Sequence, residues 1–212
     1  MDIAGILFDM DGVLVDSEPV ITEAAIRALR QYGVEAKEAD FKPFTGMGEV
    51  RFIGGVAEKY GKPFVPEMKT LTYEIYGQIV DEHLKVYAGT LDALRALSGY
   101  RLALASSADL VKVRHNLRVA HIPFATFAAI VTAEDVARKK PDPAIFLTAA
   151  EKLGLPASRC LAIDDAISGV QAGKAAGCYT VGVTTSFPAE TLLEAGADCV
   201  IAEIGELPAL LH

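Results

Sequence analysis

The chain has 212 residues, of which 51% are hydrophobic and 23% are charged, and its formal net charge is −8 at pH 7. This length suits one domain, or one domain with an insertion, and the negative charge argues against non-specific binding to nucleic acid or anionic membranes. The sequence opens without a basic segment followed by an apolar run, and it has no apolar stretch of about 18 residues. We therefore expect a cytoplasmic protein without a membrane span.

The first predicted element is a buried strand over residues 3–8, which leads directly into the segment "DMDG". Gly12 allows a tight turn there. Asp9 and Asp11 are thus expected just past the carboxyl end of the strand, where open α/β sheets bind ligands. Two buried like charges are costly unless a cation or a reaction uses them. The alternative interpretation is an acidic, solvated turn.

Residues 16–84 are predicted to be helical. In "SEPVITEAAIRALRQYG", Asp16 or Ser17 can serve as the helix N-cap, Pro19 falls in the first turn, and Gly33 ends the helix. Two further helical segments follow, "VRFIGGVAEKYG" and "MKTLTYEIYGQIVDEHL".

From residue 85 onward, short apolar runs alternate with helical segments. The runs cover residues 101–106, 127–133, 160–164, 178–183 and 199–201. Strands that alternate with helices imply right-handed crossovers and a parallel sheet. The sequence therefore predicts a doubly wound α/β core made of residues 1–15 and 85–212, into which a helical cap of residues 16–84 is inserted.

The three cysteines and the glycine-rich segments do not indicate a zinc site or a nucleotide-binding loop. Cys160, Cys178 and Cys199 match no zinc-binding spacing, and their odd number fits no closed disulfide framework, so we expect buried core thiols. The segments at 46–51 and 55–63 match neither a dinucleotide fingerprint nor a phosphate-binding loop, and no GxSxG elbow is present.

Polar residues also occur at the ends of later predicted strands or loops. They are Ser106, Ser107, Lys140, Asp164 and Asp165. Each alone has a structural explanation, because serine and aspartate cap helices and a lysine is commonly a solvated surface residue. Together they are harder to explain in that way, since a parallel sheet brings its strand ends to one edge.

Four segments, "FDMDGVLVDSEP", "LALASSAD", "RKKPDP" and "IDDAISGVQAGKAAG", resemble the four motifs of the haloacid dehalogenase superfamily in order and spacing. The helical insert is similar to the cap of its β-phosphoglucomutase-like phosphatase branch. The resemblance implies a Rossmann-like core with an inserted cap and a phosphatase that acts on a small phosphorylated metabolite, with neither a nucleic acid nor a membrane as partner. It leaves the oligomeric state open.

The resemblance also implies roles for individual residues. Asp9 would be the nucleophile that forms an aspartyl-phosphate, ionised because its ordinary pKa is about 3.9. Asp11 would protonate the leaving alcohol and then deprotonate the attacking water. Ser106 would bind the phosphoryl oxygens, with Ser107 among the substrate-binding residues, and Lys140 would stabilise charge on the phosphoryl group and on Asp9.

A magnesium ion is the cofactor that the resemblance implies. Its ligands would be Asp165, Asp9 and the carbonyl of Asp11, with Asp164 beside them. The charges support this expectation, because four aspartates and Lys140 leave an excess of negative charge that repels a phosphate monoester.

Two other functions remain as alternatives. Asp11 favours phosphoryl transfer over carbon–halogen cleavage, since the dehalogenases of the family lack this aspartate. A phosphomutase is the first alternative, but the mutases carry a histidine, an arginine and a lysine in the cap where this chain has Ile21, Glu49 and Tyr76. Arg51 lies two residues from Glu49 and could substitute for the arginine. A non-catalytic binding protein is the second, and the intact motifs argue against it.

The cap loop "FKPFTGMGEVRF" is expected to face the active site, because such caps close over the substrate. Its polar candidates for substrate binding are Thr45, Glu49 and Arg51. Glu49 could accept hydrogen bonds from sugar hydroxyls, and Arg51 could bind a carboxylate or a second phosphate. The alternative is that Glu49 and Arg51 are solvated surface residues. Small sugar phosphates are the substrates that the resemblance suggests.

Overall fold

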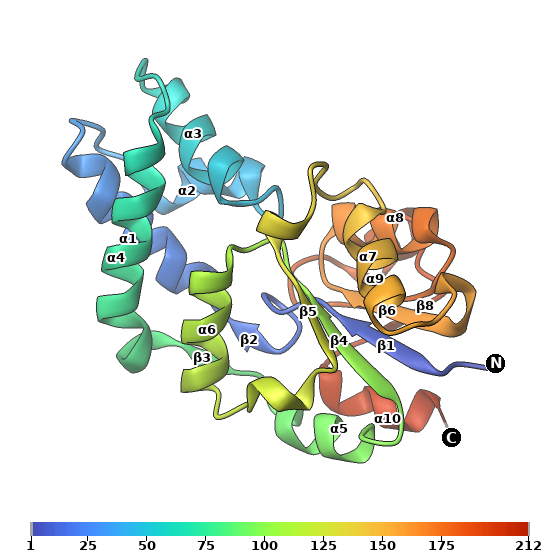
Figure 1. Ribbon diagram of the computed structural model, residues 1–212. Helices are drawn as coiled ribbons and strands as arrows, with labels where there is room; N and C mark the ends of the chain where they lie inside the picture. The colour runs from blue at the N-terminus through green and yellow to red at the C-terminus, as the bar shows by residue number, and fades with distance from the viewer. Residues whose placement is uncertain (1, 212) are drawn as a thin grey trace.

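The computed structural model describes residues 2–211 and contains a six-stranded parallel sheet with the strand order β5-β4-β1-β6-β7-β8 (Figure 1). The strands are β1 (Gly5–Phe8), β4 (Arg101–Ala105), β5 (Ala129–Val131), β6 (Cys160–Asp164), β7 (Tyr179–Val183) and β8 (Cys199–Ile201). The predicted doubly wound parallel sheet is confirmed. Strand β1 lies between β4 and β6, with Phe8 paired in register with Leu104 and Ile163.

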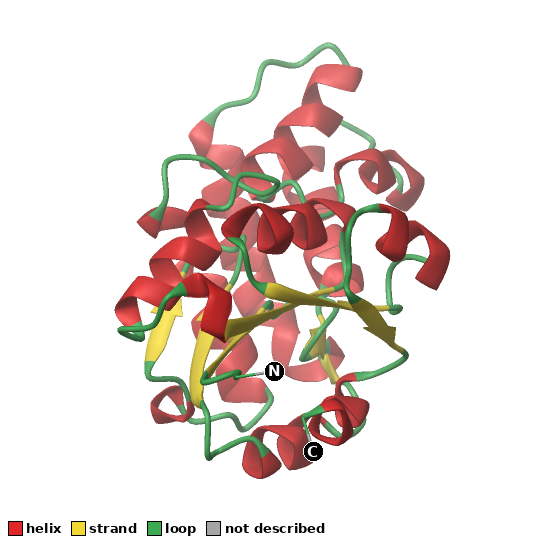
Figure 2. Cartoon of the chain, turned by 90° about the vertical axis from the view of Figure 1, so that its right-hand side faces the viewer, coloured by secondary structure: helices red, strands yellow, loops and turns green. Residues whose placement is uncertain are grey.

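Helices cover both faces of this sheet, which Figure 2 shows nearly edge-on between two helical layers. One layer contains α5 (Thr90–Ala96), α6 (Leu110–Val119) and α10 (Leu207–Leu210), and the other contains α7 (Ala144–Lys152), α8 (Ile167–Ala176) and α9 (Ala189–Glu194). Side chains alternate between the two layers along each strand, so that Phe8 packs against the first layer and Leu7 against the second. Strands buried on both faces explain why the sequence shows continuous apolar runs.

The four cap helices form a second, separate apolar cluster beside the sheet. They are α1 (Glu18–Arg30), α2 (Glu38–Phe41), α3 (Glu49–Lys59) and α4 (Pro66–His83). Helices α1 and α4 lie side by side (Figure 1). The chain enters and leaves this cluster through an antiparallel ribbon of β2 (Val15–Asp16) and β3 (Lys85–Val86). The ribbon lies where the sequence analysis placed the two domain boundaries, and the division into domains stays a prediction.

The structure differs from the sequence analysis mainly at the ends of elements. Strand β5 is shorter than the predicted run because Thr132 starts a 3-10 helix, with its hydroxyl accepting a hydrogen bond from Glu134 N at 3.3 Å.

All three thiols are free; Cys160 and Cys178 are buried as expected, whereas Cys199 is only half-buried. The 3-10 helices are η1 (Lys42–Phe44), η2 (Phe124–Thr126), η3 (Ala133–Asp135), η4 (Ala157–Arg159) and η5 (Ile204–Glu206). Within residues 2–211, no helix combines the length and the apolar character that crossing a membrane requires.

Asp40 is expected to make the stability of the cap depend on pH. Its carboxylate accepts hydrogen bonds from Lys59 Nζ at 2.5 Å, Lys37 N at 2.8 Å and the Tyr60 hydroxyl at 2.7 Å, and these bonds lower the pKa of Asp40. A carboxyl whose pKa is lowered by folding stabilises the protein above its unfolded pKa, and this contribution is lost as the pH falls through the folded pKa.

The variant Asp40→Asn is therefore expected to have a lower Tm than the wild type at about pH 6, and the difference is expected to shrink at about pH 3. Thermal unfolding of both proteins at both pH values measures this. A difference that is the same at both pH values would show that the charge of Asp40 does not stabilise the cap.

Candidate active site

Three charged residues that are far apart in the sequence meet at the carboxyl edge of the sheet. Asp9 directly follows β1, Asp164 ends the neighbouring strand β6, and Lys140 lies in the loop between β5 and α7. Lys140 Nζ is 2.5 Å from Asp9 Oδ1 and 2.7 Å from Asp164 Oδ2, and it donates a hydrogen bond to the Ala105 carbonyl at 3.2 Å. The structure thus forms the strand-end cluster that the motifs predicted, and its three charged members are buried.

Two glycines let the backbone approach the aspartates. Gly12 has φ +81°, and a Cβ there would lie 1.9 Å from Asp165 Oδ2. Gly169, in the first turn of α8, would place a Cβ 1.9 Å from Asp164 Cγ. Asp164 Oδ1 accepts a hydrogen bond from Ala166 N at 3.0 Å. Any other residue at either glycine would therefore displace an aspartate of the cluster.

Burial and mutual repulsion change the titration of these carboxyls. Burial, together with the charges of Asp164 and Asp11, raises the pKa of Asp9 to about 7 although Lys140 opposes the shift. Burial and the charges of Asp164 and Asp9 also raise the pKa of Asp165. The expectation of an ordinary pKa for Asp9 is wrong, because it took no account of the desolvation of the carboxylate.

The chemistry of this donor set fits a magnesium ion. Lys140 pairs with Asp9 and Asp164, and the Ser186 hydroxyl donates a hydrogen bond to Asp165 Oδ2. No residue in the described range donates a hydrogen bond to Asp9 Oδ2 or Asp165 Oδ1. Within residues 2–211 there is no preformed group of three side-chain metal ligands. Magnesium does not need one, because it is commonly held by one or two carboxylates and completes its shell with water and phosphate oxygens.

Asp11 contacts other residues than Asp9 does, since its lysine partner is Lys112 rather than Lys140. Asp11 Oδ1 accepts hydrogen bonds from the Ser17 hydroxyl and from Asn116 Nδ2, the latter at 3.2 Å, and Asp11 Oδ2 is 2.9 Å from Lys112 Nζ. The same lysine lies 3.4 Å from Glu49 Oε1, at the start of α3. Asp11 is therefore held in place from α6 and from the entrance of the cap.

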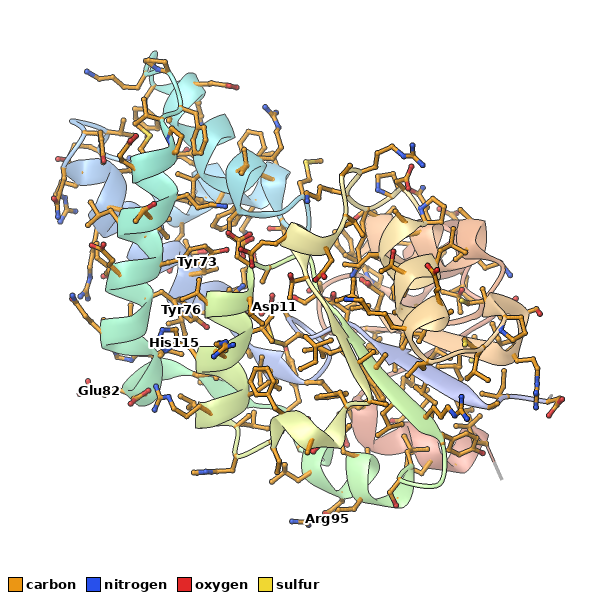
Figure 3. All side chains as sticks on the ribbon, viewed as in Figure 1. Asp11, Tyr73, Tyr76, Glu82, Arg95 and His115 are labelled. Atoms are coloured by element: carbon orange, nitrogen blue, oxygen red, sulfur yellow. The ribbon has the colours of Figure 1, made fainter. Side chains whose placement is uncertain are left out.

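Helix α4 of the cap contributes to the same set of contacts through two tyrosines. Tyr76 on α4 donates a hydrogen bond to Asn116 Oδ1. Tyr73, also on α4, accepts one from Asp109 N at 3.2 Å. Figure 3 labels Tyr73 and Tyr76 on α4 next to α6, and Asp11 beside α6. The Asn116 amide joins Tyr76 and Asp11, because its Oδ1 accepts a hydrogen bond from Tyr76 and its Nδ2 donates one to Asp11. The cap and the core are thus joined by polar contacts next to Asp11.

A cavity of about 600 Å³ lies between the cap and the carboxyl edge of the sheet. Of the predicted site residues, it is lined by Asp9, Asp11, Thr45, Glu49, Ser107, Lys140, Asp164 and Asp165. The Thr45 hydroxyl donates a hydrogen bond to Glu18 Oε1 at 3.0 Å. The cavity therefore has one wall from the core and one from the cap, as expected for a substrate site.

Two predicted site residues do not reach this cavity with their side chains. Ser106 is fully buried, and its Oγ accepts a hydrogen bond from Ala108 N at 3.1 Å. Arg51 is exposed, where it pairs with Glu58 at 3.4 Å and lies over the ring of Phe44. The structure supports the alternative interpretation of Arg51 as a surface residue, and the contact of Ser106 with a phosphoryl group stays a prediction.

Lys112 and Asn116 are site residues that the sequence analysis missed. Both lie on α6, four residues apart and hence on one face of the helix, and both are buried. Their spacing within "DLVKVRHNLRV" was the available signal. This spacing alone does not identify a site, because many helices carry two polar residues four positions apart. Its meaning becomes clear only when the structure shows that this face of α6 lies against Asp11.

Residues 3–177 match the sequence profile of the haloacid dehalogenase-like hydrolases. The chain is 40% identical over 214 residues to SUPPRESSOR OF QUENCHING 1, a chloroplastic protein of Arabidopsis thaliana, with 97% of this chain but only 20% of that protein covered. It is 33% identical over 210 residues to a phosphorylated carbohydrates phosphatase of Thermotoga maritima, covering 92% of this chain and 93% of that protein. The crystal structure of a putative beta-phosphoglucomutase from Thermotoga maritima superposes with a TM-score of 0.78 at 30% identity, covering 99% and 98% of the two chains.

Proposed function

The chain belongs to the haloacid dehalogenase-like hydrolase family, and from this premise we propose that it is a phosphatase that hydrolyses small phosphate monoesters through an aspartyl-phosphate on Asp9. The observation that carries the proposal is the contact of Lys140 with Asp9 and Asp164 at the floor of a cavity that Asp11 and Asp165 also line. The relative named as a phosphatase of phosphorylated carbohydrates supports the same activity and favours sugar phosphates as substrates.

In the proposed first step, Asp9 Oδ2 attacks phosphorus while Lys140 contacts Asp9 Oδ1. The attack forms an oxygen–phosphorus bond to Asp9 and breaks the bond to the leaving alcohol, so that one difficult displacement becomes two easier ones. Lys140 stabilises negative charge on Asp9 before the attack and on the phosphoryl oxygens during it. Ser107, at the cavity wall, is placed to contact the same oxygens.

Asp11 carries out the proton transfers. In its protonated form it donates a proton to the leaving alcohol, and as the carboxylate it then accepts one from the water that hydrolyses the intermediate. Its contacts with Lys112 and Asn116 fix the orientation of both carboxyl oxygens. Asp9 and Asp11 therefore have different tasks, which agrees with their separate sets of contacts.

Magnesium is the proposed cofactor. The carboxylates of Asp9 and Asp165 and the carbonyl of Asp11 would hold it, with Asp164 beside them, and when bound it supplies positive charge that stabilises the phosphoryl group. The pKa values of Asp9 and Asp165 are raised mainly by burial and further by the neighbouring aspartates, so a bound cation would stabilise both carboxylates in their charged form. The expected cytoplasmic location stays a prediction, and one relative is named as chloroplastic.

Phosphate release from a panel of small phosphorylated metabolites tests the proposal. The panel contains hexose, pentose and triose phosphates, phosphoglycolate and nucleoside monophosphates, each assayed with Mg²⁺ and with a chelator. We expect release from at least one class with Mg²⁺, its loss with the chelator and its recovery when Mg²⁺ is added back. Turnover that resists the chelator would contradict the site as described, and no release from any compound would favour a non-catalytic binding protein.

A phosphomutase is the second candidate, because one structural relative is named as a putative beta-phosphoglucomutase. Two cap residues argue against it. Ile21 is an apolar part of the cavity wall, and Tyr76 is fully buried with its hydroxyl bonded to Asn116, so neither provides the charged group that the mutases have at these positions. Isomerisation of glucose 1-phosphate without net phosphate release would establish the mutase instead.

A further inference from the structure

We propose that the cavity selects substrates whose leaving group carries hydroxyl or ammonium groups and no second negative charge, and that Glu49 is the residue that recognises those groups. The proposal rests on the phosphatase function and deepens it, since it concerns the part of the substrate that leaves rather than the phosphoryl group. Two independent features of the cavity carry it, the distribution of charge on its wall and an unpartnered buried oxygen.

The charged wall of the cavity lacks a free buried cation for a second anionic group. Eight carboxylates and three lysines line it, and among the described residues no arginine or histidine does. Lys140 is engaged by Asp9 and Asp164, while Lys112 is engaged by Asp11 and Glu49.

The remaining charges on this wall are predominantly negative. Lys42 is the third lysine and is exposed. Asp16, Glu18 and Glu38 line the same wall and form no ion pair within residues 2–211. A substrate carboxylate or second phosphate would therefore meet more negative than positive charge outside the phosphoryl site.

Glu49 is the second feature. It is the first residue of α3, only 8% exposed, and Lys112 holds its Oε1 at 3.4 Å. Its Oε2 is buried and is the one buried side-chain polar atom in residues 2–211 that has no hydrogen-bond partner. Leaving a buried polar atom unpaired is costly, so a ligand group that pairs with it gains affinity. A hydroxyl or an ammonium can donate that hydrogen bond, whereas a carboxylate cannot.

Neighbouring cap residues complete a surface for a hydroxylated carbon skeleton. Glu18 is half-buried in the wall, and the Thr45 hydroxyl fixes its Oε1, which makes it a second oriented acceptor. Phe44 and Phe52 line the same cavity and provide apolar area for the carbon atoms. This combination of few oriented polar groups and apolar walls is typical of small-molecule sites.

The test compares substrates that share a phosphate position and differ in the charge of the leaving group. Glucose 6-phosphate, sorbitol 6-phosphate and glucosamine 6-phosphate carry no second negative charge, whereas 6-phosphogluconate carries a carboxylate and fructose 1,6-bisphosphate a second phosphate. We expect the first three to have kcat/KM values at least about tenfold higher than the last two, with Mg²⁺ present throughout. p-Nitrophenyl phosphate is included because it reports phosphatase activity without sugar recognition.

Glu49→Gln tests the assigned residue, and Glu58→Gln is its matched control on the exposed face of the same helix. We expect Glu49→Gln to reduce the ratio of kcat/KM for glucose 6-phosphate over 6-phosphogluconate by about tenfold, because it removes the charge and one acceptor. Glu58→Gln is expected to leave the ratio unchanged. Glu18→Gln provides a second variant in the cap wall, and it is expected to reduce the ratio in the same direction.

The outcomes separate this inference from the function on which it rests. Hydrolysis of p-nitrophenyl phosphate together with a preference for 6-phosphogluconate or the bisphosphate would overturn the inference and leave the phosphatase intact. If neither Glu49→Gln nor Glu18→Gln changed the ratio of kcat/KM for glucose 6-phosphate over 6-phosphogluconate, the cap wall would not select the leaving group. No hydrolysis of any compound, including p-nitrophenyl phosphate, would overturn the phosphatase and the inference with it.

Discussion

Replacing Asp9 with asparagine is expected to lower phosphate release by about 10⁴-fold or more, because the amide cannot form the covalent intermediate. Asp9 is held at the end of β1 by Lys140, and its free oxygen is part of the cavity wall. The loss should appear in kcat for every substrate, including p-nitrophenyl phosphate, whose good leaving group needs little acid catalysis. Steady-state phosphate release with Mg²⁺ measures it.

The fold of the Asp9→Asn variant should survive. Asparagine has almost the same shape as aspartate, and Lys140 keeps its contact with Asp164 at 2.7 Å. Asp92→Asn is a suitable control, since Asp92 is exposed and pairs with the equally exposed Arg95 on α5. It should have wild-type turnover. If a folded Asp9→Asn variant retained more than about 1% of the wild-type turnover, Asp9 would not be the nucleophile.

Lys140→Met is expected to lower turnover by about 10² to 10⁴-fold and also to destabilise the metal-free protein. The substitution removes the positive charge beside the transferred phosphoryl group. It also leaves Asp9 and Asp164 without their buried partner, and breaking a buried ion pair in this way costs about 3–5 kcal/mol when the remaining charges stay ionised. Turnover with Mg²⁺ and thermal unfolding without it measure the two effects.

The loss of thermal stability caused by Lys140→Met is expected to grow as the pH rises. Without Lys140, the pKa of Asp9 rises further, and a carboxyl with a raised folded pKa loses stabilising free energy as the pH increases through that range. The Tm difference from the wild type should therefore be larger at about pH 8 than at about pH 5. Lys139→Met is the control, because Lys139 is exposed and outside the cavity. Wild-type turnover in Lys140→Met would remove Lys140 from the mechanism.

The sheet and the aspartates at its edge could be predicted because both depend on local sequence. The runs that form β1 and β6 are buried on both faces, so they stand out as continuous apolar segments, and their ends locate Asp9 and Asp164 directly. The parallel order then brings both residues to one edge without any further information. Lys140 was predictable for a different reason, namely the resemblance of its surrounding motif to a known family.

The residues that the sequence did not locate depend on long-range packing. Lys112 and Asn116 contact Asp11 only because α6 lies between the cap and the sheet. The side chains of Ser106 and Ser107 point to different sides, because successive residues of a strand alternate in this way. Of the two serines, Ser107 lines the cavity. Arg51 follows the buried Glu49 by two residues on α3, and residues two positions apart on a helix lie on different faces. The side chain of Arg51 is therefore exposed to solvent.

The aspartyl-phosphate on Asp9 can be trapped if the second step of the reaction is blocked. The Asp11→Asn variant, mixed with p-nitrophenyl phosphate and Mg²⁺, should release one p-nitrophenolate per active site in a rapid burst, because hydrolysis of the intermediate lacks its general base. Rapid acid quenching followed by mass spectrometry should then find one phosphoryl group on the peptide that contains Asp9. A burst without phosphorylation of that peptide, or a phosphoryl group on another residue, would contradict the account.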